Sequence, residues 1–166
     1  MDSSGNETFE TIRDNCLTNL KILSKIKSGD KLYYYDNTFI IDSPAITQPI
    51  SRWYYAESRQ TTVKHLEELL VKLFQTIDHI YSSEVGKDTM ENNYYARVSK
   101  TNIVFKEENS AMLLQFINEM KNAIEGLGNL KQTYKDDIST CSSIDIVIEK
   151  LNVRIKKISS VLSISK

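Results

Sequence analysis

The sequence predicts a mainly α-helical domain, a bundle of four to five helices with one small β-hairpin. Two observations predict this class. Apolar residues recur every three or four positions over most of the 166 residues, which places them on one face of successive helices. Near residue 36, two short runs rich in tyrosine and isoleucine flank a pair of turn-forming residues. We expect a single domain over residues 1–166, because a chain of this length buries one core and no linker divides it.

The first helix is expected from Glu7 to about Lys27. Its apolar stripe consists of residues three or four positions apart, namely Phe9, Ile12, Cys16, Leu20 and Leu23. Gly29 is the expected C-terminal cap, because glycine readily adopts the left-handed conformation that commonly ends a helix.

A β-hairpin is expected at about 31–42, with Asp36 and Asn37 as a two-residue turn. The predicted register pairs Leu32 with Ile41 and Tyr34 with Phe39 on one face, and Lys31 with Asp42 and Tyr33 with Ile40 on the other. The first face is apolar and should bury against the helices, since a two-stranded ribbon alone is marginally stable. The alternative is that an edge of the hairpin recruits a strand from a partner.

The longest helix is expected at about 58–83, where apolar residues follow a heptad-like spacing from Val63 to Ile80. This spacing fits both an intramolecular bundle and a dimer seam. A loop should follow at 82–93. Residues 94–108 favour a helix, and a short strand at 102–105 is the alternative.

The C-terminal third of the chain is expected to form three helical segments. The first is capped by Asn109 or Ser110 and is interrupted at Gly126-Leu127-Gly128. A short helix follows at 129–137. The last helix is expected at about 143–163, with Ser142 and Asp145 in a spacing that resembles a capping box.

Composition and charge exclude several classes of protein. A net charge of −1 provides no overall field that would attract nucleic acid or a membrane. The first residues lack the basic and apolar regions of a signal peptide, and no apolar run approaches the ~20 residues that span a bilayer. Cys16 and Cys141 are isolated, which is typical of small buried side chains. We therefore expect a soluble intracellular protein without a membrane partner.

The segment from Thr47 to Arg59 holds the only tryptophan and one of the two prolines. Tryptophan, tyrosine and arginine dominate binding hot spots, so this segment is a candidate protein interface. The alternative is a corner in which Trp53 seals the end of the bundle. The candidate interface residues are Gln48, Arg52, Trp53, Tyr54, Tyr55 and Arg59, together with Tyr33 and Tyr35 of the hairpin.

Motifs for metal binding or catalysis are not found in the sequence. His65 and His79 lie on one predicted helix about 21 Å apart, which is too far to share an ion. No Cys-x-x-Cys, HExxH, EF-hand or phosphate-binding loop occurs. We expect a protein that is not an enzyme and that has no catalytic residue, metal site or cofactor.

The last helix provides an alternative function. Residues 144–166 contain five basic and two acidic residues, and a basic helix can contact phosphates. Lys150, Arg154, Lys156 and Lys157 are the candidate nucleic-acid contacts. The alternative is a solvated helix face, because basic residues near a helix C-terminus also suit the helix dipole.

Two stretches, Thr47 to Tyr55 with Glu57-Ser58-Arg59 and Gly126 to Asp137, resemble short uncharacterised proteins of large nucleocytoplasmic DNA viruses. The resemblance implies a small viral factor or virion component, located in the host-cell cytoplasm or in the virion, and assigns no catalytic residue. The expected function is a non-enzymatic protein–protein interaction or a structural role. The expected partner is another protein or a second copy of the chain, and weak nucleic-acid binding is the alternative.

Overall fold

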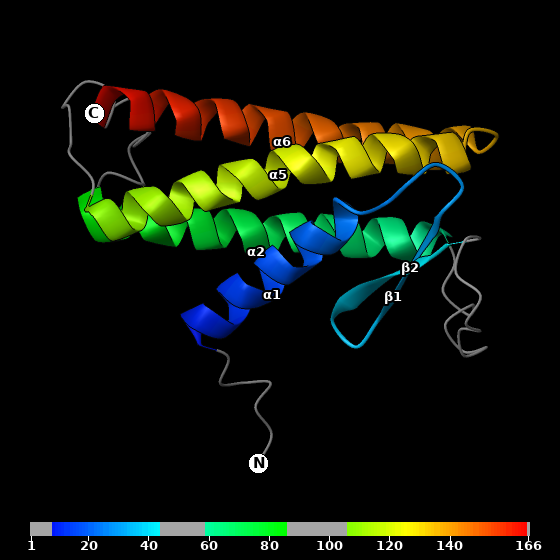
Figure 1. Cartoon of the computed structure of the whole chain (residues 1–166), viewed down its shortest axis with the longest axis horizontal. Coiled ribbons are helices and arrows are strands. Elements are labelled where there is room, and N and C mark those ends of the chain that lie inside the picture. The colour runs from blue at the N-terminus through cyan, green and yellow to red at the C-terminus, as the bar shows by residue number, and fades with distance from the viewer. Residues whose placement is uncertain (1–7, 44–58, 86–105, 166) are drawn as a thin grey trace, which may run out of the picture.

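The computed structural model describes residues 8–43, 59–85 and 106–165, which form four helices and one antiparallel hairpin. Figure 1 shows α2, α5 and α6 side by side along the long axis, with α1 crossing them at an angle and the hairpin against α1 and α2. The predicted mainly helical class is confirmed for these residues. The elements are α1 (Phe9–Leu23), β1 (Lys31–Tyr35), β2 (Thr38–Asp42), α2 (Arg59–Val85), α5 (Glu107–Thr133) and α6 (Ile138–Ser165).

A single cluster of buried apolar side chains joins the four helices and the hairpin. The apolar stripes predicted for the helices form most of this cluster, because residues three and four positions apart lie on the same face of a helix. The long helix α2 confirms the expected range of about 58–83, and it contributes Leu66, Leu73 and Ile77 to this core. Residues 94–105 lie outside the described residues, so the choice between helix and strand there stays open.

The hairpin confirms both the turn and the register expected from the sequence. Asp36 and Asn37 have positive φ angles of 54° and 64°, as a turn of type I′ requires. Leu32 and Phe39 lie on the predicted core face and are 1% and 2% exposed. Tyr33, on the opposite face, is also buried, with 9% of its surface exposed. The face opposite the predicted core face is therefore also buried at this residue.

Helix α1 ends at Leu23, about one turn before the expected end near Lys27. The Ser24 hydroxyl donates to the carbonyl of Lys21 (2.6 Å), and tight turns then bury Ile26. Gly29 has a φ angle of 98°, but it lies in the turn after these residues and does not cap the helix. The predicted end was too late because Ile26 is buried in the turns after the helix and not on a further helical turn.

Helix α5 is continuous from Glu107 to Thr133, so the predicted interruption at Gly126-Leu127-Gly128 and the separate helix at 129–137 are wrong. It also begins before the expected caps Asn109 and Ser110, with Lys106 at the N-cap position. A glycine inside a helix costs about 1 kcal/mol, which a tertiary contact can offset. The two glycines predicted a break in the helix, but nothing in the local sequence predicts the contact of Gly126 with Leu23.

Helix α6 begins at Ile138, five residues before the expected start near 143. The Asp137 carboxylate accepts a hydrogen bond from the backbone N–H of Thr140 (3.0 Å). This N–H lies in the first turn of the helix and has no partner within the helix. Ser142 and Asp145 therefore lie inside the helix. The predicted capping box is wrong because an aspartate earlier in the chain already provides the cap.

Candidate functional site

The predicted interface around Trp53 falls almost wholly outside the described residues. Gln48, Arg52, Trp53, Tyr54 and Tyr55 belong to the range 44–58, and of Arg59 only the backbone, at the start of α2, is described. On the hairpin, Tyr33 is buried and offers little surface to a partner, whereas Tyr35 beside the turn is 48% exposed. The interface prediction therefore stays untested at its centre.

The edges of the hairpin are partly occupied by side chains of the helices. In this register the backbone groups of Leu32 and Phe39 point away from the partner strand. The N–H of Leu32 donates to the Tyr134 hydroxyl (3.4 Å), and its carbonyl accepts from the Thr62 hydroxyl (3.1 Å). On the other edge, the N–H of Phe39 donates to Asn19 Oδ1 (2.9 Å). A strand from a partner would have to displace these bonds, which disfavours recruitment there.

Two of the four candidate nucleic-acid contacts pair with carboxylates of α2. Lys150 Nζ lies 3.2 Å from Glu67 Oε1, and Arg154 Nη1 lies 2.8 Å from Asp78 Oδ1. The Arg154 guanidinium also lies over the ring of Phe74, 4.3 Å from its centroid. Lys156 and Lys157 are exposed. Binding to phosphates through all four residues would therefore break two ion pairs between α6 and α2.

The two histidines are held by ring contacts on the surface of α2. His65 stacks on Tyr34 with centroids 3.8 Å apart, and its Nδ1 lies 3.0 Å from Glu68 Oε1. His79 lies against Phe9 at 4.5 Å. Within the described ranges, no three His, Cys, Asp or Glu side chains gather as metal ligands would.

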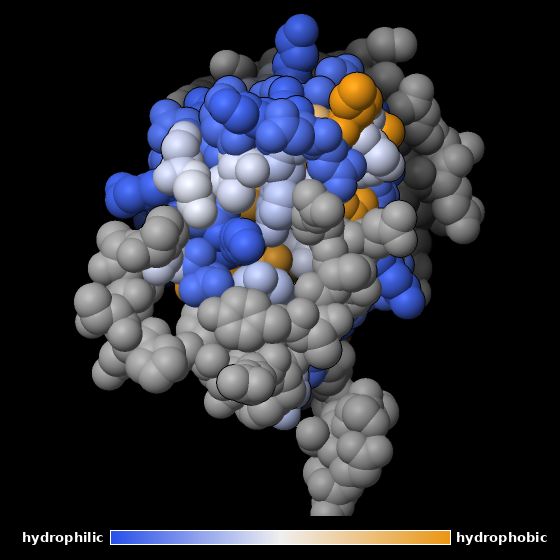
Figure 2. All heavy atoms as spheres, turned by 90° about the vertical axis from the view of Figure 1, so that its right-hand side faces the viewer, coloured by the Kyte–Doolittle hydropathy of each residue, from blue (hydrophilic) through white to orange (hydrophobic). Residues whose placement is uncertain are grey.

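Exposed apolar side chains are scattered over several elements. The most exposed is Ile138, at 79%, in the first turn of α6. Figure 2 views the end of the bundle that lies on the right in Figure 1, and it shows a mostly hydrophilic surface with a small hydrophobic patch near the top. In the part of the chain that the structure describes, no helix combines the length and apolar character needed to span a membrane.

Helix α1 meets α5 most closely at its C-terminal end, which we call the closed end and define by Leu23, Ile26, Gly126 and Asn129. A Cβ atom built on Gly126 would lie only 1.7 Å from the carbonyl oxygen of Leu23, so only glycine fits without movement. Asn129 Nδ2 donates to the carbonyl of Ile26 (2.8 Å). Backbone contact and a hydrogen bond thus fix α1 against α5 at this point.

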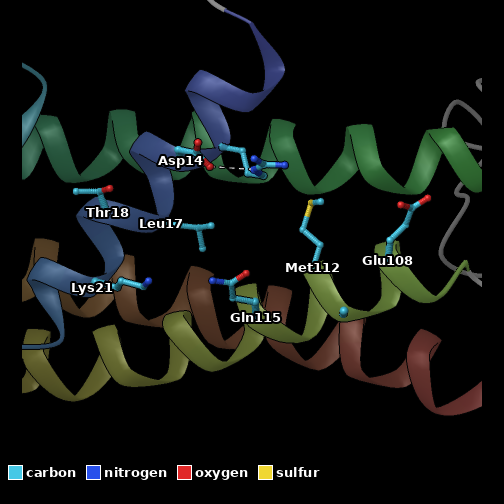
Figure 3. Close-up of a pocket in the computed structure, with 9 residues that line it drawn as sticks. Asp14, Leu17, Thr18, Lys21, Glu108, Met112 and Gln115 are labelled. Carbon is cyan, nitrogen blue, oxygen red and sulfur yellow. Dashed lines mark hydrogen bonds and ion pairs between the residues drawn. The ribbon is translucent and has the colours of Figure 1, made fainter.

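Toward the N-termini of the same two helices lies an open groove of about 600 Å³. Figure 3 shows Leu17 and Met112 between the two helices, with Lys21 and Glu108 toward opposite ends. Both apolar side chains are half-buried and pack against the core. The lining residues, which we call the α1–α5 groove, are Arg13, Asp14, Leu17, Thr18, Lys21, Glu108, Ala111, Met112 and Gln115.

The charges of the α1–α5 groove are unevenly partnered. Arg13 Nε donates to Asp14 Oδ1 at 3.1 Å, and this pair neutralises the two charges at the beginning of the α1 side. Lys21 and Glu108 are exposed, and among the described residues neither pairs with an opposite charge. The groove therefore has an apolar floor, a positive end and a negative end.

The α1–α5 groove was not predicted from the sequence. One signal was present, since Leu17 lies outside the stripe of α1 that runs from Phe9 to Leu23. An apolar residue beside the main stripe indicates a second surface on the same helix. Its partner Met112 is 95 positions away in the sequence, and no local pattern connects the two.

Comparison with protein-family models, with curated proteins and with solved structures finds no match.

Proposed function

We propose that this chain is a non-enzymatic interaction protein that binds a short amphipathic helix of another protein in the α1–α5 groove. The observation that carries the proposal is the half-buried pair Leu17 and Met112 between the oppositely charged residues Lys21 and Glu108. An amphipathic helix places apolar side chains on such a floor and keeps its polar side chains toward solvent.

The dimensions of the groove favour a helix of a few turns. From Glu108 to Gln115 the α5 side spans seven residues, about 10 Å at 1.5 Å per residue. That length corresponds to about two helical turns, so an occupant would contact the floor with residues one turn apart. An extended peptide would find no strand edge to pair with in the groove, because helices form both walls, whereas a helix satisfies its backbone groups internally.

Other occupants fit the observations less well. A second copy of the chain could satisfy Lys21 and Glu108 reciprocally, but two concave surfaces facing each other leave a void between them. Nucleic acid would meet a lining with two acidic and two basic residues, which has no net positive charge. The predicted viral role and the predicted interface at Trp53 stay predictions and do not carry this proposal.

The test is selection from a displayed library of helical peptides, about fourteen residues or four turns long. Leucines are fixed three and four positions apart, and the polar positions are randomised. Selected peptides are then measured by fluorescence anisotropy against the unmodified protein, against Ala111→Trp, which fills the groove at an exposed position, and against Leu114→Trp. Leu114 is an exposed residue of the same helix that does not line the groove.

We expect peptides that bind the unmodified protein and Leu114→Trp equally and lose at least roughly tenfold in affinity on Ala111→Trp, since a tryptophan there occupies the space of the peptide. Circular dichroism should show that both variants stay folded, because neither substitution removes a buried side chain. A library that yields no binders, or binders that Ala111→Trp leaves unaffected, would overturn the proposal.

A further inference from the structure

We infer that the helix bound in the α1–α5 groove runs antiparallel to both α1 and α5, with an acidic residue in its first turn against Lys21 and a basic residue in its last bound turn against Glu108. This inference rests on the proposed function and specifies the partner further. The sequence of the partner helix should accordingly have an acidic residue before a basic one.

The direction of the groove follows from the contacts between its walls. Residues 13–21 of α1 face residues 108–115 of α5, and at the closed end Leu23 and Ile26 meet Gly126 and Asn129. Residue numbers thus increase together along both helices. The negative end of the groove, at Glu108, lies where both walls begin, and the positive end, at Lys21, lies toward the closed end (Figure 3).

The intrinsic charge preference of helices then selects one orientation of the occupant. A helix is stabilised by acidic side chains in its first turn and by basic side chains in its last turn, because the helix dipole is positive at the N-terminus. In the antiparallel orientation these preferred residues face Lys21 and Glu108. A parallel occupant would need a basic first turn and an acidic last turn to make the same pairs, which its own dipole opposes.

The spacing of the groove sets the spacing of the charges. Glu108 and Gln115 lie about two turns apart on α5, and Figure 3 shows Lys21 beyond Gln115 along the groove. The acidic and basic residues of the occupant should therefore lie more than two turns apart, near opposite ends of the bound helix. Apolar residues three and four positions apart between them would contact Leu17 and Met112. The Arg13–Asp14 pair is already neutralised, so it favours neither order.

The charge order is tested with two peptides of identical composition, one with glutamate in the first turn and lysine in the last turn, and one with the two exchanged. The fixed leucines of the library are kept in both. Each peptide is measured against the unmodified protein and against the double variant Lys21→Glu/Glu108→Lys. The control is Lys121→Glu/Glu107→Lys, which makes the same exchange at exposed positions of α5 outside the groove.

We expect the glutamate-first peptide to bind the unmodified protein about tenfold more tightly than the exchanged peptide, and the double variant to reverse this preference, since two exposed ion pairs become two repulsions. The control variant should keep the original preference. The proposed orientation is wrong if Ala111→Trp abolishes binding but the two peptides bind equally, or if the lysine-first peptide binds more tightly. Either result leaves the proposed function intact. Peptides that bind without regard to Ala111→Trp, or that do not bind, overturn both.

Discussion

The two ends of the contact between α1 and α5 differ in how the helices approach each other. At the closed end, the Leu23 carbonyl occupies the place where a residue other than glycine would put its Cβ at position 126. In the α1–α5 groove, Leu17 lies six residues before Leu23 and Met112 lies fourteen residues before Gly126, and both side chains are partly exposed around a volume of about 600 Å³. The same pair of helices therefore has one end fixed by backbone contact and one end that forms an open groove.

The difference between the two ends arises from small sequence features. A glycine lets two helix backbones approach closely, and α1 crosses α5 at an angle, so the distance between them grows away from that point (Figure 1). Two helices that cross at an angle contact each other over a few turns only. Gly126 thus permits the close approach at one end, and substitutions at either end should change the stability of the protein differently.

The largest effect is expected from truncating the core face of α1. Leu20 is fully buried, so Leu20→Ala should lower the free energy of unfolding by about 3 kcal/mol through lost burial and a residual cavity. Leu17→Ala, on the groove side of the same helix, should cost only about 1 kcal/mol because its side chain is partly exposed. Urea unfolding followed by circular dichroism measures both, and equal losses would mean that the groove is not open.

The next effect concerns the two glycines of α5. Gly126→Ala places a Cβ against the Leu23 carbonyl and should destabilise the protein by about 2 kcal/mol, since a tightly packed site resists added volume. Gly128→Ala meets nothing within 4 Å and should stabilise it by about 0.5–1 kcal/mol through helix propensity. Thermal unfolding compares the two substitutions, which share the same gain in propensity. Changes of the same sign would contradict the close approach at Gly126.

A smaller effect is expected at the hydrogen bond of the closed end. Asn129→Ala removes the bond from Nδ2 to the Ile26 carbonyl, which is worth about 1 kcal/mol. Asn122→Ala is the matched control, because Asn122 is exposed on the same helix and gains the same helix propensity. Denaturant titration of the two variants isolates the hydrogen bond. If both variants changed stability equally, Asn129 would contribute nothing to holding α1 in place.

Local patterns predicted the elements of this fold better than the contacts between them. The hairpin was predicted residue by residue, because Asp36 and Asn37 suit its turn and the alternation of side chains fixes its register. The ends of the helices were not, because they depend on partners elsewhere in the chain. Helix propensity alone predicts an interruption at Gly126, but in the fold this glycine lies inside α5 and lets the Leu23 carbonyl of α1 approach closely.

The candidate site was less accessible to prediction than the fold. The sequence predicted a protein interface around Trp53, which lies outside the described residues. It also offered basic residues of α6 as candidate nucleic-acid contacts. Lys150 and Arg154 instead face carboxylates of α2, a pairing between positions 76 to 83 residues apart. A groove between α1 and α5 depends on the angle at which two distant helices cross, and no local pattern encodes that angle.

A ¹⁵N-edited NMR titration with the glutamate-first peptide tests most directly whether a helix binds in the α1–α5 groove. We expect the largest amide shift changes at residues 13–21 of α1 and 108–115 of α5, with small changes at Gly126 and Asn129 of the closed end. Such a map would show that a helix occupies the open end while the closed end stays fixed. Amide shift changes around Ile146 and Val153 on the outer face of α6, with none along the α1–α5 groove, would show that the peptide does not bind in the groove.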